Sequence, residues 1–111
     1  MNIEENLIRY CQIDTQSDPS SKAAPSADNV FVLAELLKKQ LEEIGMSDVY
    51  LSKYGYVYAS LPANTDKKLP TVAFIAHMDT APDYSGKNVK PRVIRNYDGS
   101  DIKLNASLMM K

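Results

Sequence analysis

Several features are scarce in this chain of 111 residues, and each shortage excludes a class of structure. The only cysteine is Cys11, so no intramolecular disulfide can form, which fits a reducing compartment. No apolar stretch approaches the roughly 18 to 20 residues that span a bilayer, and the first residues are acidic rather than basic. We therefore expect a cytoplasmic protein with no secretory signal and no membrane partner.

Neither sign of charge is in surplus, because 13 basic residues face 14 acidic ones. A net charge of −1 gives no electrostatic footprint for nucleic acid, so we expect no nucleic-acid partner. With 44% hydrophobic and 24% charged residues, the composition is that of an ordinary globular protein. A chain of this length is one domain or a piece of one, and a compact unit of its size hides roughly two-thirds of its unfolded surface.

The single histidine, His77, ends an apolar run. Residues 72–76 show no polar alternation, which predicts a strand buried on both faces of an α/β sheet. Sheets of that kind hold their sites at the carboxyl ends of strands. Because residues i and i+2 of a strand share a face, we expect Asp79 beside His77 and Met78 turned toward the core. A carboxylate there can accept the second ring N–H of a metal-bound imidazole, so His77 is the candidate metal ligand and Asp79 its orienting residue.

Other interpretations of these polar residues stay open or are disfavoured. A lone histidine is more often a hydrogen-bonded structural residue than a ligand. Ser17 and Ser85 lack the glycine-flanked elbow of a serine nucleophile, and Gly86-Lys87 lacks the rest of a P-loop. Three further carboxylates are predicted to be loop or turn residues: Asp83, Asp98 and Asp101.

The rest of the chain predicts two helices and several short strands. A first helix is expected near residues 3–14, begun by Asn2, and a second near residues 27–44, begun by Ser26 and ended by Gly45. Residues 14–21 are rich in turn-forming types and predict a surface loop, which is either a solvated connection or a contact with the rim of a site. Two short strands, residues 48–54 and 56–61, flank Gly55 and predict a hairpin or a bulged corner. The tyrosines of these strands are expected to pack across the strands, although an aromatic row could also stack a substrate or a base. A further hairpin is expected between residues 92–96 and 101–104.

The site residues lie in a longer pattern that resembles a known family. The run Ile75-Ala-His-Met-Asp-Thr-Ala-Pro-Asp83, followed by Ser85-Gly-Lys-Asn-Val89, resembles peptidase T, the aminotripeptidase branch of the zinc-dependent M20 metallopeptidases. The likeness extends from Asp14-Thr-Gln-Ser17 through Leu61-Pro-Ala-Asn64 to residues 96–104. A His-x-Asp pattern alone is weak, whereas the nine-residue run with its extension is far more specific.

The resemblance implies an α/β fold in which residues 1–111 are the N-terminal part of a zinc-peptidase-like catalytic domain, with a central sheet flanked by helices. The rest of that catalytic domain and a lid domain would lie outside residues 1–111. His77 would bind one zinc ion of a two-zinc site and Asp79 would orient it, while the other ligands and a catalytic glutamate would lie downstream. The complete enzyme would be a metallo-aminopeptidase that releases the N-terminal residue of tripeptides. The isolated chain should be inactive and should not hold zinc tightly.

Two alternatives stand beside this hypothesis. In the first, the chain would be a non-catalytic fragment that self-associates through exposed sheet edges. In the second, it would be part of a related M20 carboxypeptidase or deacylase. The extension at residues 85–89 argues against the second. Small peptides are the expected partners, and a homo-oligomer is left open.

Overall fold

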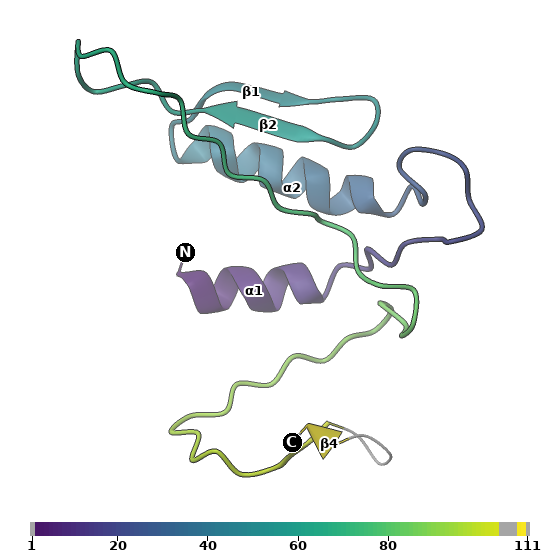
Figure 1. The fold of residues 1–111 in the computed structure, drawn as a ribbon. Helices are drawn as coiled ribbons and strands as arrows, with labels where there is room; N and C mark the ends of the chain where they lie inside the picture. Colours follow the sequence, from purple (N-terminus) through teal and green to yellow (C-terminus); the bar gives the residue numbers. More distant parts are fainter. Residues whose placement is uncertain (1, 105–108, 111) are drawn as a thin grey trace.

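Two helices and two small antiparallel sheets form the regular structure of the part that is described (Figure 1). The computed structural model describes residues 2–104 and 109–110. The elements, in chain order, are α1 (Ile3–Cys11), α2 (Val30–Glu43), β1 (Ser47–Leu51), β2 (Val57–Ser60), β3 (Ile102–Lys103) and β4 (Met109–Met110). No helix in the described residues is long and apolar enough to cross a bilayer.

Helix α1 begins as its sequence predicts. The Glu5 amide donates to the Asn2 side chain at 2.8 Å, and the Asn2 amide donates to the Glu5 carboxylate at 3.2 Å, which completes a capping box. The Tyr10 hydroxyl donates to Gln40 at 2.6 Å, and the Gln40 amide donates to Asn6 at 3.0 Å. These polar contacts join α1 to α2.

Helix α2 starts later than predicted but ends as predicted. The expected cap, Ser26, is wrong, because its hydroxyl accepts a bond from the Asp18 amide at 3.1 Å and the helix begins four residues beyond it, at Val30. Gly45 follows the helix at φ +83°, where its amide donates to Glu42 and the next amide, that of Met46, to the Leu41 carbonyl. This is a Schellman ending, which favours glycine at the left-handed position.

The hairpin of β1 and β2 packs against α2, on the side away from α1 (Figure 1). Tyr50 lies opposite Tyr58, with ring centroids 6.3 Å apart and nearly parallel planes. At the turn, the Ser52 hydroxyl accepts the amides of Tyr54 and Tyr56, and Gly55 takes φ +82°. The predicted hairpin and its tyrosine packing are therefore confirmed.

The apolar core is small. Only Val30, Leu33 and Ala34 are buried hydrophobic residues among those described. The radius of gyration is 17.6 Å, whereas a compact domain of this length has about 13 Å. The chain is therefore much more extended than a self-sufficient domain of its length.

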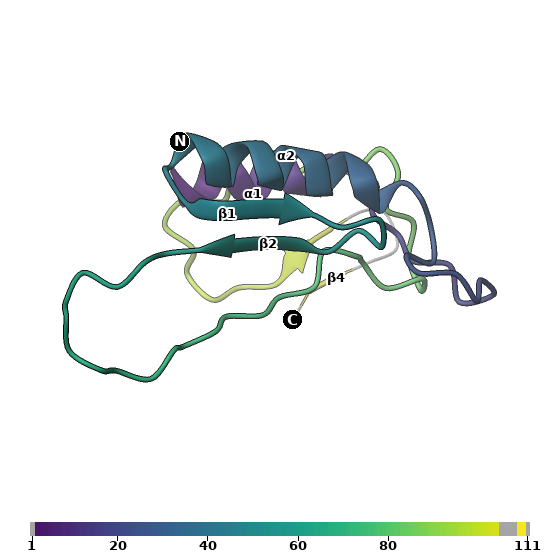
Figure 2. The same cartoon turned by 90° about the horizontal axis from the view of Figure 1, so that it is seen from above.

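The predicted buried strand at residues 72–76 is wrong. These residues are extended but exposed, with Phe74 and Ile75 each 96% exposed. Figure 2 shows the chain after β2 looping out beyond the hairpin and returning apart from β2. An apolar run without alternation needs a partner strand on its edges and a layer on each face, and the described residues supply neither. The central sheet expected for the fold class is accordingly not formed, although helices and a small sheet are present.

The second predicted hairpin is also wrong in its pairing. Ile102 and Lys103 pair with Met110 and Met109 instead of with residues 92–96. Residues 92–96 contact α1 instead, because the Arg95 guanidinium donates two hydrogen bonds of 3.1 and 3.2 Å to the Glu4 carboxylate. A fork-like contact of this kind fixes the orientation of both side chains.

Candidate functional site

A parallel bridge joins the loop after α1 to the segment that follows His77. The Thr80 amide donates to the Thr15 carbonyl at 2.9 Å, and the Ser17 amide donates to the Thr80 carbonyl at 3.0 Å. The Ser17 hydroxyl donates to the same carbonyl at 3.0 Å. Thr15 is only 4% exposed, so the bridge is anchored in one of the few buried parts of the chain.

Gln16 extends this bridge into a clamp, defined here as residues 14–17 together with residues 80–86. Its side chain donates to the Pro82 carbonyl at 3.0 Å and accepts the Gly86 amide at 3.3 Å. Its own amide donates to the Asp14 carboxylate at 3.1 Å. A Cβ on residue 86 would lie 2.6 Å from that carboxylate oxygen, so only glycine allows this close approach.

The sequence predicts a surface loop at residues 14–21 that either connects elements or contacts the rim of a site, and nothing in its pattern indicates the clamp. The pairing is between distant segments and follows no periodic pattern. The one local signal was Gly86 in a polar loop, since a glycine without a turn to explain it often marks a close backbone approach.

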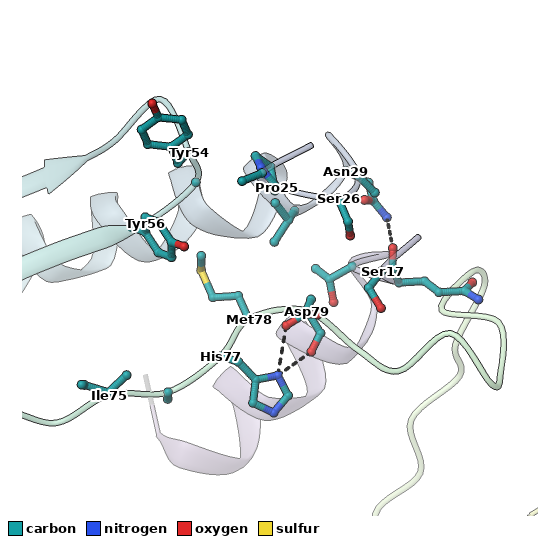
Figure 3. A pocket seen from close by; sticks show the side chains of 17 residues that line it. Ser17, Pro25, Ser26, Asn29, Tyr54, Tyr56, Ile75, His77, Met78 and Asp79 are labelled. Atoms are coloured by element: carbon teal, nitrogen blue, oxygen red, sulfur yellow. Dashed lines mark hydrogen bonds and ion pairs between the residues drawn. The ribbon is translucent and has the colours of Figure 1, made fainter. Parts of the chain in front are cut away.

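The clamp begins directly after Asp79, and His77 and Asp79 contact each other as expected (Figure 3). The His77 Nδ1 atom lies 2.8 Å from the Asp79 carbonyl oxygen and 3.2 Å from its carboxylate oxygen. Both of these atoms can only accept, so Nδ1 carries the proton in this geometry. In the neutral ring Nε2 then has the lone pair, and the side chain is 84% exposed. The imidazole is therefore in the form that binds a metal through Nε2.

A cavity of about 340 Å³ lies beside this pair. It is bounded by the clamp loop, the start of α2, the hairpin turn at Gly55 and residues 75–79. Figure 3 shows Met78 pointing toward Tyr56 while His77 points the other way. Met78 is half-buried, unlike its neighbours on either side. The predicted alternation of direction is thus present, although Met78 faces a cavity instead of a packed core.

The donor set does not make a zinc site by itself. Within the described part of the chain, no group of three or more histidine, cysteine or acidic side chains could hold a metal ion. Structural and catalytic zinc sites use at least three protein ligands. His77 has the chemistry of one ligand, and the described residues do not bring two further side chains of this kind together with it.

Asp98 has a structural role within a turn. It accepts the Ser100 amide at 3.0 Å, and the hydrogen bonds from Ser100 hold the pKa of this carboxyl below its ordinary value. This agrees with its prediction as a turn carboxylate.

The chain is similar to bacterial peptidases over nearly its whole length. The relatives are named peptidase T: that of a Geobacillus species is 52% identical over 106 residues, which is 96% of this chain. The Bacillus licheniformis protein is 53% identical over 104 residues (94%), and that of Caldanaerobacter subterraneus is 50% identical over 103 residues (93%). No family model matches the chain. The predicted resemblance to peptidase T is confirmed, and the chain spans about a quarter of the length of these relatives, 25% to 26%.

Proposed function

We propose that this chain supplies one part of the active site of a zinc-dependent aminopeptidase of the peptidase T type. His77 is one zinc ligand, and Asp79 is the residue that orients it. Residues 1–111 form the N-terminal part of the catalytic domain, and the whole enzyme releases the N-terminal residue of tripeptides in the cytoplasm. The similarity to peptidase T over nearly the whole chain supports peptide hydrolysis as the class of reaction.

The observation that carries the proposal is the tautomer of the His77 ring, meaning which of its two nitrogens carries the proton. Nδ1 faces two acceptors of Asp79 at 2.8 and 3.2 Å, which favours the tautomer with its lone pair on exposed Nε2. Metal-bound histidines commonly donate their other ring N–H to a carboxylate or carbonyl in this way, and the partner raises the basicity of the ring. The His77 side chain is 84% exposed, so Nε2 is open to a metal ion.

The residues of the chain prepare a ligand and leave the site incomplete. Asp79 holds the proton on Nδ1, and the clamp fixes the backbone that follows Asp79. When bound, zinc would acidify a water molecule and polarise the peptide carbonyl. The remaining ligands and a general base must come from outside the described residues, because at least three protein ligands are needed.

The tautomer can be measured directly, because the chain has a single histidine. Nitrogen-15 spectra of the untagged protein at mildly alkaline pH should show one imidazole with its proton on Nδ1. Asp79→Ala removes the carboxylate acceptor at 3.2 Å but keeps the carbonyl acceptor at 2.8 Å, so it should shift the population only partly toward the other tautomer. Asp83→Ala removes a nearby carboxylate that has no contact with the ring and serves as the matched control. A ring protonated on Nε2 in the parent protein would contradict the proposal.

Zinc titration and a peptide assay test the incompleteness of the site. The isolated chain should bind zinc weakly and should not hydrolyse a tripeptide. Tight stoichiometric zinc together with turnover by this chain alone would show that the ligands are misassigned and that Asp83, Asp98 or Asp101 takes part.

A further inference from the structure

The shortest polar contact of the His77 ring is with a backbone group. Nδ1 lies 2.8 Å from the Asp79 carbonyl oxygen and 3.2 Å from the Asp79 carboxylate (Figure 3). Either kind of oxygen can accept the ring N–H and orient a metal-bound imidazole. The direction of the ring therefore depends on how the main chain presents this carbonyl, as well as on the Asp79 side chain.

The same carbonyl belongs to a peptide group that the loop after α1 holds from the other side. The peptide bond between Asp79 and Thr80 is trans and planar, so its C=O and its N–H point in opposite directions. The Thr80 N–H donates to the Thr15 carbonyl at 2.9 Å. One rigid plane thus links Thr15 to the His77 ring, and a rotation of this plane that breaks one contact also weakens the other.

Gln16 is the side chain that keeps this peptide group in place. Its main chain is paired with Thr80 in the parallel bridge. Its side-chain amide uses both of its ends on the segment that follows, because Nε2 donates to the Pro82 carbonyl at 3.0 Å and Oε1 accepts the Gly86 amide at 3.3 Å. These two contacts hold the chain beyond Thr80 against the loop, so the bridge at Thr80 is fixed from both of its sides.

We propose that Gln16 is a positioning residue for the metal ligand. It acts through the peptide group between Asp79 and Thr80, directs the Asp79 carbonyl at Nδ1 and so keeps the lone pair of His77 on Nε2. This role rests on the proposed function of His77 as a zinc ligand, and it adds that residues 14–17 set the direction of the ring. A ligand that is already oriented loses less freedom when the metal binds, which favours binding.

The tautomer of His77 in the metal-free chain tests the proposal. Nitrogen-15 spectra at mildly alkaline pH, recorded with a chelator, report the ratio of rings protonated on Nδ1 to rings protonated on Nε2. Gln16→Ala removes both side-chain contacts and should lower this ratio by about two- to tenfold, the range that one hydrogen bond of ordinary strength supports. Gln40→Ala is the matched control and should leave the ratio unchanged, since Gln40 also joins two segments through both ends of its amide, at Tyr10 and Asn6.

A second background separates the carbonyl of Asp79 from its carboxylate. In Asp79→Ala the carboxylate is removed and the carbonyl acceptor remains. Gln16→Ala should therefore lower the ratio in this background as well, and the double variant should lose the preference for Nδ1. An effect of Gln16→Ala that is confined to the parent background would mean that Gln16 acts through the Asp79 side chain, which contradicts the route through the peptide group.

Failure of this inference can be told apart from failure of the proposed function. A parent chain with the His77 proton on Nε2 would overturn both. A parent chain with the proton on Nδ1 would overturn the role of Gln16 alone if its ratio is the same in Gln16→Ala, or if Gln40→Ala lowers the ratio equally. Either of these last results leaves His77 as the proposed zinc ligand.

Discussion

Replacement of Gly86 by alanine should open the clamp, and the cost can be worked out from the contacts. The backbone of Gly86 does not have a positive φ, so the effect of a methyl group there is steric. The new Cβ would lie 2.6 Å from the Asp14 carboxylate oxygen. Gln16 atoms at 3.3 and 3.4 Å leave the Cβ little room to move away from that oxygen. The carboxylate must therefore turn away and lose its bond to the Gln16 amide, which is 3.1 Å long.

A hydrogen bond to a charged acceptor contributes about 1.5 to 3 kcal/mol. The contact is only partly buried, so we take the lower limit, about 1.5 kcal/mol. Since 1.4 kcal/mol corresponds to a factor of ten, local opening of the clamp should become about tenfold more frequent. Native-state hydrogen exchange of the Thr80 and Ser17 amides, which form the bridge, should accelerate by that factor.

The comparison has two controls. The Ser52 amide, bonded to the Tyr56 carbonyl at 2.8 Å in the hairpin, should exchange at an unchanged rate. In an Asp14→Ala background the clash is absent, so Gly86→Ala should add little further effect. Unchanged exchange at Thr80 and Ser17, or an equal effect in both backgrounds, would refute the steric reasoning.

Three further changes test local features of the fold. Asn2→Ala removes the capping box and should reduce the helicity of α1, at a cost of about 0.5 to 2 kcal/mol, as measured by circular dichroism and hydrogen exchange. Gly45→Ala at φ +83° should destabilise the end of α2 by about 1 kcal/mol in denaturant unfolding. The pKa of Asp98 is lowered in the folded chain, so its turn is stabilised at neutral pH and loses this support as the pH falls through that lowered pKa. Ser100→Ala should raise this pKa toward its ordinary value in a carboxyl titration by NMR.

Local features of the fold could be predicted from the sequence because neighbouring residues determine them. The capping box at Asn2, the glycine that ends α2 and the turn at Gly55 each depend on a few adjacent residues. The contact between His77 and Asp79 is local too, which explains why it forms even though the predicted strand does not. The start of α2 was misplaced because the Ser26 hydroxyl binds the distant Asp18 amide instead of the helix.

Features that depend on distant partners could not be predicted. The apolar pattern of residues 72–76 indicates burial, but burial requires layers that the described residues do not supply. The pairing of Thr15 and Ser17 with Thr80 joins loops that carry no periodic signal. Arg95 contacts Glu4 through an ion pair that nothing in the local sequence specifies. In each case the outcome depends on which surfaces meet, and the pattern of one segment contains no information about its partner.

The most direct test of the central claim is to place this chain in the context of a complete relative. In the Bacillus licheniformis peptidase T, the 104 aligned residues can be replaced by those of this chain, and zinc content and tripeptide hydrolysis measured together. We expect an active, zinc-containing chimera that loses zinc and activity with His77→Ala. Asp79→Asn should lower metal affinity or activity by roughly 10 to 100-fold, and Asp83→Asn should leave both near the unsubstituted level. Unchanged zinc content and turnover in the His77→Ala chimera would contradict the claim that this histidine is a ligand of the peptidase site.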